Sequence, residues 1–317
     1  ALQYVDVPAM RFDKITNGVS YIGIENHSGK LHKIWNAISL FREGCRLIRE
    51  NRPSYILCDA IAVSPCYVAI ALGKKYHIPK IGIVTDLPGM LRVNKDPMVG
   101  IGRMRKFDGY VLLTEQMNAI VNPTHKPHLV MEGLCAPRLP TVRTKNAHPR
   151  IILYTGSLWK HDAGIEYFVE GFIKADIPNC ELHLYGIGEL VDWLIEVEKT
   201  HPSVRYMGCV TNNEIVRKQC EATLLVNPRP SNEEFCKYSF PSKTIEYMAS
   251  GTPVLMTCLP GVPDEYFDYV YTISEENSEG VCTTLKILLS DEDGIKEKGL
   301  KAREYVCTHK NCKKQAK

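Results

Sequence analysis

The sequence predicts an α/β protein built from two doubly wound domains with a cleft between them. Its 317 residues are about twice the usual length of one domain, which favours two domains of similar size. Short apolar runs alternate with amphipathic helical patterns, as in repeated strand-helix-strand units. A proline-rich break at residues 135–150 interrupts this alternation, so we expect domains at residues 1–140 and 141–317.

The first half predicts a parallel sheet with helices between its strands. Apolar runs typical of strands occur at residues 55–58, 81–84, 110–113 and 129–131. Ahead of them, apolar side chains recur at helical spacing, at Ile34, Ile38, Phe41, Cys45 and Ile48. We therefore expect a helix whose buried stripe contains these residues.

The second half restarts the same alternation. Strands are predicted at residues 151–154, 182–185, 204–207, 223–226 and 254–256. A helical stripe follows the first of them, at Ile165, Phe168, Val169, Phe172 and Ile173. Both halves thus read as Rossmann-like domains, in which ligands bind at the carboxyl ends of the strands.

Composition and charge limit the class of protein. The chain is 44% apolar and 24% charged and has no apolar run long enough to span a membrane, so it is neither disordered nor transmembrane. Its 12 cysteines include no CxxC pair, and no secretory leader is recognised, which favours reduced thiols and a cytoplasmic location.

The two halves differ in charge. Residues 1–140 hold 18 Lys and Arg against 11 Asp and Glu, a net +7, whereas the rest holds 21 against 25, a net −4. A basic first half suits an anionic membrane, a phosphorylated acceptor or a merely solvated surface. Nucleic acid is not expected, because no aromatic-basic interleaving accompanies the charge.

The most informative segment runs from residue 238 to residue 255. Ser239 is a candidate N-cap, Pro241 suits the first helical turn, and Gly251 with Pro253 behind it ends the helix. These residues predict one short helix between two apolar strands.

The start of this helix has the chemistry of a nucleoside diphosphate site. Its unpaired backbone N–H groups would hold a phosphate, to which Ser242 adds a hydroxyl and Lys243 a positive charge. About one turn further on, Glu246 would accept hydrogen bonds from two vicinal hydroxyls, such as those of a ribose. The alternative is an ordinary capped helix with a surface lysine.

This segment also resembles the donor-site signature of family 4 glycosyltransferases, which have the two-domain GT-B fold. Further segments resemble that family in the same order, at residues 154–165 with Gly156 and Gly164, at 184–188, and at 204–210, where Val210 would lie beside the nucleotide base. The likeness covers residues 150–275. The first half resembles the family's acceptor domain more loosely, at residues 75–81 and at 85–88 around Asp86.

The resemblance implies transfer of a sugar from a nucleotide sugar to a glycan or lipid-linked acceptor, with retention at the anomeric carbon and without metal or cofactor. Bacterial-type surface polysaccharide assembly is the implied setting, with peripheral contact to the inner face of the membrane through the basic first half. Lys243, Glu246 and Asp86 are the implied catalytic residues, with Asp86 orienting an acceptor hydroxyl. Donor contacts are expected from Gly156, Ser157, Lys160, Val210, Arg229, Glu234, Ser242, Lys243 and Glu246.

The chain departs from the family pattern at several positions. Tyr238 stands where the family usually has a glutamate, so Glu233 or Glu234 is expected to reach the donor sugar instead. The family's first strand with its glycine-rich loop, and part of its last helix, are expected to lie outside this chain.

The positive charges around the first glycine loop also differ. An arginine and a lysine usual in the family are Ser157 and Ala163 here, which leaves the diphosphate to Lys243, with Lys160 or Arg229. These changes keep open a non-catalytic donor-binding subunit, and a nucleotide-sugar epimerase would share the fold and the donor. A dinucleotide site at 186–188 is disfavoured, because the third glycine of that motif is absent.

Overall fold

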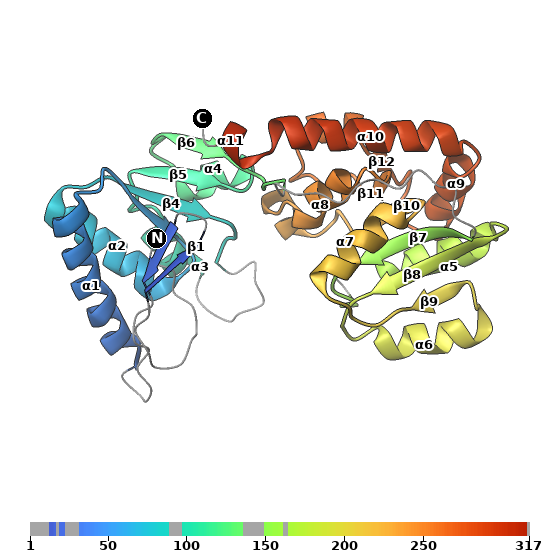
Figure 1. Cartoon of the computed structure of the whole chain (residues 1–317), viewed down its shortest axis with the longest axis horizontal. Helices are drawn as coiled ribbons and strands as arrows, with labels where there is room; N and C mark the ends of the chain where they lie inside the picture. Colours follow the sequence, from blue (N-terminus) through green and yellow to red (C-terminus); the bar gives the residue numbers. More distant parts are fainter. Residues whose placement is uncertain are drawn as a thin grey trace. The chain divides into compact units, whose positions relative to one another are not determined.

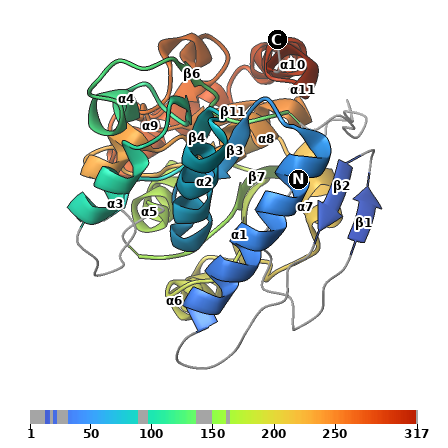
Figure 2. The same ribbon diagram turned by 90° about the vertical axis from the view of Figure 1, so that its left-hand side faces the viewer.

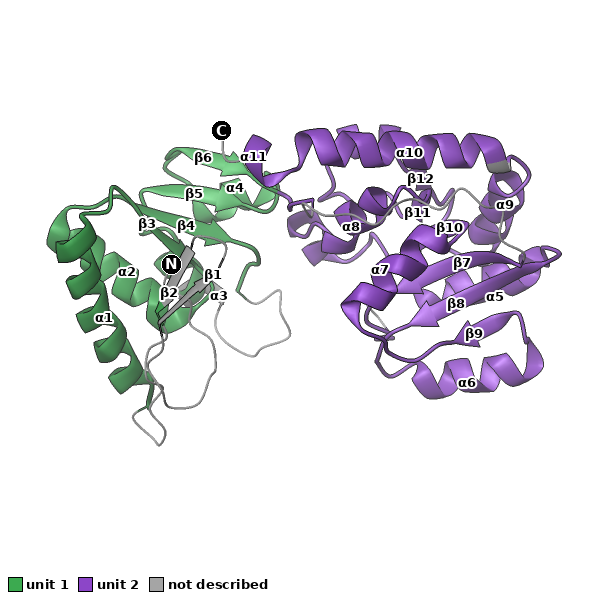
Figure 3. Cartoon of the chain, viewed as in Figure 1, with its two compact units in different colours: residues 1–131 green, residues 132–317 purple. Residues whose placement is uncertain are grey.

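The computed structural model describes residues 13–16, 19–22, 32–88, 97–135, 149–160 and 164–315. The chain divides into two compact units, Ala1–Met131 and Glu132–Lys317, shown in different colours in Figure 3. The predicted boundary at residue 140 and most of the predicted linker lie outside the described residues.

The first unit is built on a parallel sheet. Strands β3 (Ile56–Asp59), β4 (Lys80–Val84), β5 (Gly109–Leu112) and β6 (His128–Val130) pair in this order, which confirms the predicted strands (Figure 1). The helices are α1 (His32–Asn51), α2 (Val63–Tyr76), α3 (Pro97–Met104) and α4 (Gln116–Val121). An antiparallel pair that the sequence did not predict, β1 (Asp13–Thr16) with β2 (Val19–Ile22), precedes them.

The buried face of α1 differs from the predicted stripe. Figure 2 shows α1 alongside α2, and their shared core contains Leu40, Cys45, Ile48, Val68 and Leu72. Ile34 and Ile38, expected in the stripe, are 57% and 42% exposed. The other three residues of the stripe, Phe41, Cys45 and Ile48, do belong to this core or pack against it. The two helices come close together at Gly44, where a Cβ would lie 2.5 Å from Cδ1 of Leu72.

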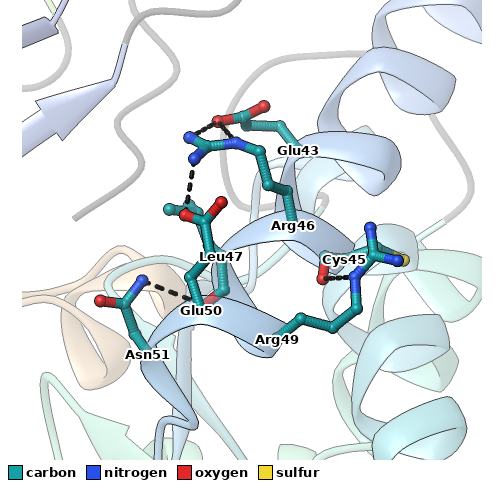
Figure 4. Close-up of polar contacts among 7 residues, drawn as sticks. All are labelled: Glu43, Cys45, Arg46, Leu47, Arg49, Glu50 and Asn51. Atoms are coloured by element: carbon teal, nitrogen blue, oxygen red, sulfur yellow. Dashed lines mark hydrogen bonds and ion pairs between the residues drawn. The ribbon is translucent and has the colours of Figure 1, made fainter.

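The outer side of α1 carries local polar contacts (Figure 4). Arg46 pairs with Glu43 one turn before it and with Glu50 one turn after it, the latter at 2.6 Å. Arg49 donates to the carbonyl oxygen of Cys45 over 3.2 Å, and Asn51 donates to that of Leu47 over 3.1 Å. Such contacts link neighbouring turns of one helix and support it locally.

The second unit holds a six-stranded parallel sheet in the order β12-β11-β10-β7-β8-β9. Its strands are β7 (Arg150–Thr155), β8 (Cys180–Tyr185), β9 (Val204–Tyr206), β10 (Leu224–Asn227), β11 (Val254–Met256) and β12 (Tyr271–Thr272). Its helices are α5 (Ile165–Ala175), α6 (Val191–Thr200), α7 (Asn212–Glu221), α8 (Ser242–Ser250), α9 (Ser278–Leu288), α10 (Glu292–His309) and α11 (Cys312–Gln315). Two short 3-10 helices, η1 (Glu234–Tyr238) and η2 (Asp264–Asp268), complete it.

The strand order of this unit reverses at β7. From β7 the chain proceeds outward through β8 and β9, then returns to place β10 on the other side of β7. The loops after β7 and β10 therefore run in opposite directions, which opens a crevice at the carboxyl ends of these two strands. Within the described part of the chain, no helix combines the length and the apolar character that crossing a membrane requires.

Candidate functional site

The loop after β7 packs tightly against its neighbours. Gly186, after β8, has a φ of +149°, and a Cβ there would lie 1.7 Å from the carbonyl oxygen of Gly156. Gly164, with a φ of +64°, approaches the loop after β10 in the same way. A Cβ added at this position would lie 1.9 Å from the carbonyl oxygen of Pro228. Tyr167 donates a hydrogen bond to the same oxygen. The two glycines thus let three loops meet at the switch point of the sheet.

The first residues of α8 lie at this meeting of loops. Lys243 Nζ donates to the hydroxyl of Tyr154 over 3.1 Å and lies 4.3 Å from the centre of that ring. A Cβ on Gly156 would come within 2.4 Å of the same Nζ. The ammonium group therefore lies directly against the glycine loop.

Burial changes the acidity of this lysine. Desolvation, with a smaller contribution from the charge of Arg229, lowers the pKa of Lys243 to about 7, while Glu246 opposes the change. An anion bound at this point would stabilise the protonated form and raise the pKa again.

The predicted N-cap of α8 was wrong. Ser239 Oγ accepts a hydrogen bond from Arg229 over 3.1 Å, and the N-cap position is held by Pro241, whose side chain caps nothing. Pro241 begins the helix at its own position because its ring fixes φ, here −66°, and it lacks an N–H. The predicted end is confirmed, since Gly251 adopts a left-handed φ of +80°. Without a side-chain cap, the first N–H groups of α8 remain available to an anion.

Glu246 lies one turn after Lys243 and is exposed. Its Oε1 accepts a hydrogen bond from Gln219 Nε2 over 2.5 Å. Gln219 is fully buried on α7, and the same nitrogen lies 3.3 Å from Thr155 Oγ1 at the end of β7. Thr155 is itself held by Tyr247, which donates to its carbonyl oxygen and accepts from its N–H. This network fixes one carboxylate oxygen of Glu246.

Sequence reasoning missed Gln219. Its position on α7 carries no motif, and its role depends on the packing of α7 against α8, which no local spacing reveals.

The other predicted donor residues lie on loops of the same unit. Arg229, after β10, lies 4.7 Å from the ring of Phe235, and Ser157 follows Gly156 on the loop after β7. Lys160 is exposed, 4.0 Å from Glu166. Gly156 lies in contact with Lys243, and the charges of Arg229 and Glu246 both affect the ammonium group of Lys243. The structure does not connect Lys160 to them.

The other residues that the sequence predicts to bind substrate are exposed or belong to the first unit. Val210, after β9, is 43% exposed, and Ser242 is exposed at the first position of α8. Glu234 is exposed at the start of η1, on the segment that ends with Tyr238. Asp86 belongs to the first unit, half-buried after β4. Ala163 lies outside the described residues.

These groups have the chemistry that an anion would require, next to a carboxylate that could accept hydrogen bonds from hydroxyl groups. A helix N-terminus, a glycine loop and a lysine are suited to a diphosphate, and the Glu246 carboxylate only accepts hydrogen bonds. Among the described residues, no three His, Cys, Asp or Glu side chains are arranged to hold a metal ion.

Comparison with known proteins gives a family match and several similar folds. Residues 149–291 match the family model of the group 1 glycosyl transferases. Sucrose-phosphate synthase from Thermosynechococcus elongatus has a similar structure, with a TM-score of 0.71 and 15% identity over 97% of this chain and 83% of that one. Anabaena HepE in complex with UDP has a TM-score of 0.69 and 11% identity over 93% and 84% of the two chains.

A further similar structure is the lipopolysaccharide outer core galactosyltransferase WaaB, with a TM-score of 0.61 and 15% identity over 92% and 82% of the two chains. No curated protein sequence matches this chain significantly.

The fold, with two Rossmann-like units each built on a parallel sheet, is that of the GT-B glycosyltransferases. Residues 149–291, which lie in the second unit, belong to the group 1 glycosyl transferase family by the match to its model.

Proposed function

We propose that this enzyme transfers a hexose or related sugar from a nucleoside diphosphate donor to a glycan or lipid-linked acceptor, with retention at the anomeric carbon. The observation that carries the proposal is the position of Lys243 Nζ, against Gly156 at the uncapped start of α8. Glu246 follows one turn later. This order along one helix matches the order of diphosphate and ribose in a nucleotide sugar.

The diphosphate is the part of the donor that gains charge in the reaction. As the bond to the sugar breaks, negative charge develops on the leaving phosphate, and preorganised donors stabilise it most effectively. Ser242 and the N–H groups of α8, the backbone of Gly156 and Ser157, and the ammonium of Lys243 provide these donors. Arg229 and Lys160 add positive charge from neighbouring loops.

The rest of the donor is assigned to neighbouring positions. Glu246 accepts from the ribose hydroxyls through the oxygen that Gln219 leaves available, and the base lies beside the exposed Val210. Glu234 is assigned to the hydroxyls of the donor sugar, in place of the family glutamate that Tyr238 replaces.

The acceptor is assigned to the first unit. Asp86 follows β4 at the carboxyl edge of that sheet, where a carboxylate would orient an acceptor hydroxyl. The leaving phosphate takes the proton of this hydroxyl as the new bond forms on the same face of the sugar.

The setting of the reaction is proposed from similar structures and from charge. Neighbours include HepE in complex with UDP and glucose, and a pneumococcal O-GlcNAc transferase, GtfA, in complex with UDP and GlcNAc. WaaB is a galactosyltransferase of the lipopolysaccharide outer core. We assign this chain to surface polysaccharide assembly in the cytoplasm, with its basic first half on the inner face of the membrane.

Product analysis with a panel of nucleotide sugars tests the proposal. The expected result is release of nucleoside diphosphate that depends on an added glycan or lipid-linked acceptor and is lost in Lys243→Ala. An epimerase would convert the nucleotide sugar without an acceptor. Donor binding with no product under any acceptor would indicate a non-catalytic subunit and contradict the proposal.

A further inference from the structure

Arg103, in the first unit, is a buried cation without a counter-ion in the part of the chain that the structure describes. Its side chain is 7% exposed, and among the described residues its Nε is buried without any hydrogen-bond partner. None of the ion pairs found between described residues of this unit includes it. Burying an unpaired charge is costly, and an unmade hydrogen bond adds about 1–3 kcal/mol, so the arrangement favours an anion supplied from outside.

The guanidinium lies at the start of α2. Its Nη2 donates to the carbonyl oxygens of Ala60 and Ile61, over 3.5 Å and 3.3 Å, in the segment that connects β3 to α2. Its Cζ lies 5.8 Å from the ring of Tyr67, in the second turn of the helix. Arg103 therefore reaches the N-terminus of α2 from a separate helix, α3.

The N-terminus of α2 is itself open to an anion. Its N-cap, Ala62, is extended and has no side chain that could accept a hydrogen bond from the first turn. That turn contains no acidic residue. Asp59, at the end of β3, already accepts from the N–H of Ile61 over 2.9 Å. The partial positive charge at the N-terminus of α2 and the charge of Arg103 therefore both favour an anion here. The first turn of α2 contributes no carboxylate of its own.

The buried thiol of Cys66 reports the local field. Burial raises the pKa of this thiol, and the positive charges of Arg103 and Lys106 oppose that rise, with Arg103 contributing more than the charge of Asp59 does in the other direction. Arg103 therefore brings its positive charge close to Cys66, near the carboxyl edge of β3 and next to the strand that Asp86 follows.

We propose that Arg103 and the N-terminus of α2 form a phosphate-binding site for the acceptor. A phosphate oxygen would accept from the N–H groups of Val63 and Ser64, since Pro65 has none, while the guanidinium neutralises the charge. Calling the ligand an acceptor rests on the proposed function, but phosphate binding itself does not. The phosphate belongs either to a soluble phosphorylated sugar or to a lipid phosphate, and the two sources are separable by experiment.

Titration with inorganic phosphate at constant ionic strength tests the site, with Lys243→Met present in every protein compared so that the start of α8 does not contribute. Calorimetry should give an affinity at least about tenfold weaker in Arg103→Met than in the parent, the loss typical of a charge-assisted hydrogen bond. Arg105→Met is the matched control, since Arg105 also donates to a backbone carbonyl, that of Ile120, but lies away from α2. Its phosphate affinity should equal that of the parent.

Ala62→Asp provides a variant that does not depend on removing a buried side chain. The new carboxylate would cap α2 and occupy the phosphate position, so the melting temperature should rise while phosphate affinity falls about tenfold or more. If Arg103→Met does not fold, the phosphate affinity of Ala62→Asp alone tests the proposal. Unchanged phosphate affinity in Ala62→Asp, or no phosphate binding by the parent, would overturn the proposal.

Two further measurements identify the source and separate this site from the donor site. Parent protein that sediments with phosphatidylcholine vesicles only when they contain phosphatidic acid, and no longer does so as Ala62→Asp, would assign a lipid phosphate. Binding of inorganic phosphate without such sedimentation would assign a soluble one. The affinity for nucleoside diphosphate should be unchanged in Ala62→Asp. A wrong assignment at α2 would therefore appear in the phosphate titration, and a wrong donor assignment in the nucleotide titration.

Discussion

Gln219 Nε2 lies 2.5 Å from Oε1 of Glu246, although the two residues belong to different helices. Because Gln219 is fully buried, its amide cannot turn toward water, and it holds the carboxylate in one orientation. The amide oxygen of Gln219 is buried without a partner among the described residues. A glutamine kept in such a position at the expense of one hydrogen bond is best explained by the orientation it gives to Glu246.

Gln219→Met should therefore weaken nucleotide binding without contacting the nucleotide. The methionine keeps the volume of the side chain but leaves the Glu246 carboxylate unrestrained, so affinity for a nucleoside diphosphate should fall about tenfold. The preference for a ribonucleotide over its 2′-deoxy analogue should fall with it.

Calorimetry with both nucleotides measures these two effects. Lys218→Met, an exposed change at the neighbouring position of α7, is the control and should alter neither. A variant that lost affinity equally for both nucleotides would indicate a general disturbance of the site, not a loss of ribose recognition.

Lys243 should make the stability of the unliganded protein depend on pH. Its pKa of about 7 in the folded state lies below its ordinary value of 10.5, so the unfolded chain binds more protons between these values. Stability therefore increases with pH across this window, and the destabilising effect of Lys243 is complete below about pH 7. Lys243→Met should raise the melting temperature relative to the parent by more at about pH 6 than at about pH 10. An equal difference at both pH values would refute this.

Donor binding should depend on the same proton. An anion stabilises the ammonium form, so nucleoside diphosphate binding by the parent should take up protons and weaken as the pH rises above about 7. The nucleotide has a titrating phosphate of its own, and Lys243→Met corrects for it. Calorimetry in two buffers of different ionisation enthalpy should show a larger proton uptake in the parent than in the variant.

Gly164→Ala should damage the switch point more than an ordinary glycine substitution does. The added Cβ would lie 1.9 Å from the carbonyl oxygen of Pro228, in addition to the strain of a φ of +64°. Gly208→Ala is the control, since Gly208 has a similar φ of +70° but no atom within 4 Å of the position that a Cβ would take. Denaturant unfolding should show a loss of about 1 kcal/mol for Gly208→Ala and a clearly larger loss for Gly164→Ala.

The sequence was sufficient where local chemistry decides the structure. Strands β3 to β11 follow from apolar runs, and the end of α8 follows from Gly251, which adopts the left-handed conformation that such an end requires. Where packing between elements decides, local patterns failed. Ile34 and Ile38 fit the helical spacing of the buried Cys45 and are nevertheless exposed, and the pair β1–β2 and the short β12 were not predicted. Pro241, not Ser239, is the N-cap of α8.

The candidate site shows the same division. Lys243 and Glu246 could be predicted because their spacing from the start of one helix carries the chemistry. Gln219 and Arg103 could not, since each acts on a helix other than its own. Their importance follows from burial and from atoms that lack a partner among the described residues, which are properties of the folded chain.

In the proposed function, the α8 segment of the second unit binds the nucleoside diphosphate of the donor, with the ribose at Glu246. Calorimetry with UDP on Glu246→Gln tests this most directly, because the substitution keeps the size of the side chain and removes its charge. We expect a loss of about 1.5–3 kcal/mol in the free energy of UDP binding, as for a hydrogen bond to a charged group. Glu198→Gln, which removes a carboxylate that accepts from Arg205 on the same unit, should bind UDP like the parent. If Glu246→Gln also binds UDP as tightly as the parent, the donor assignment is contradicted.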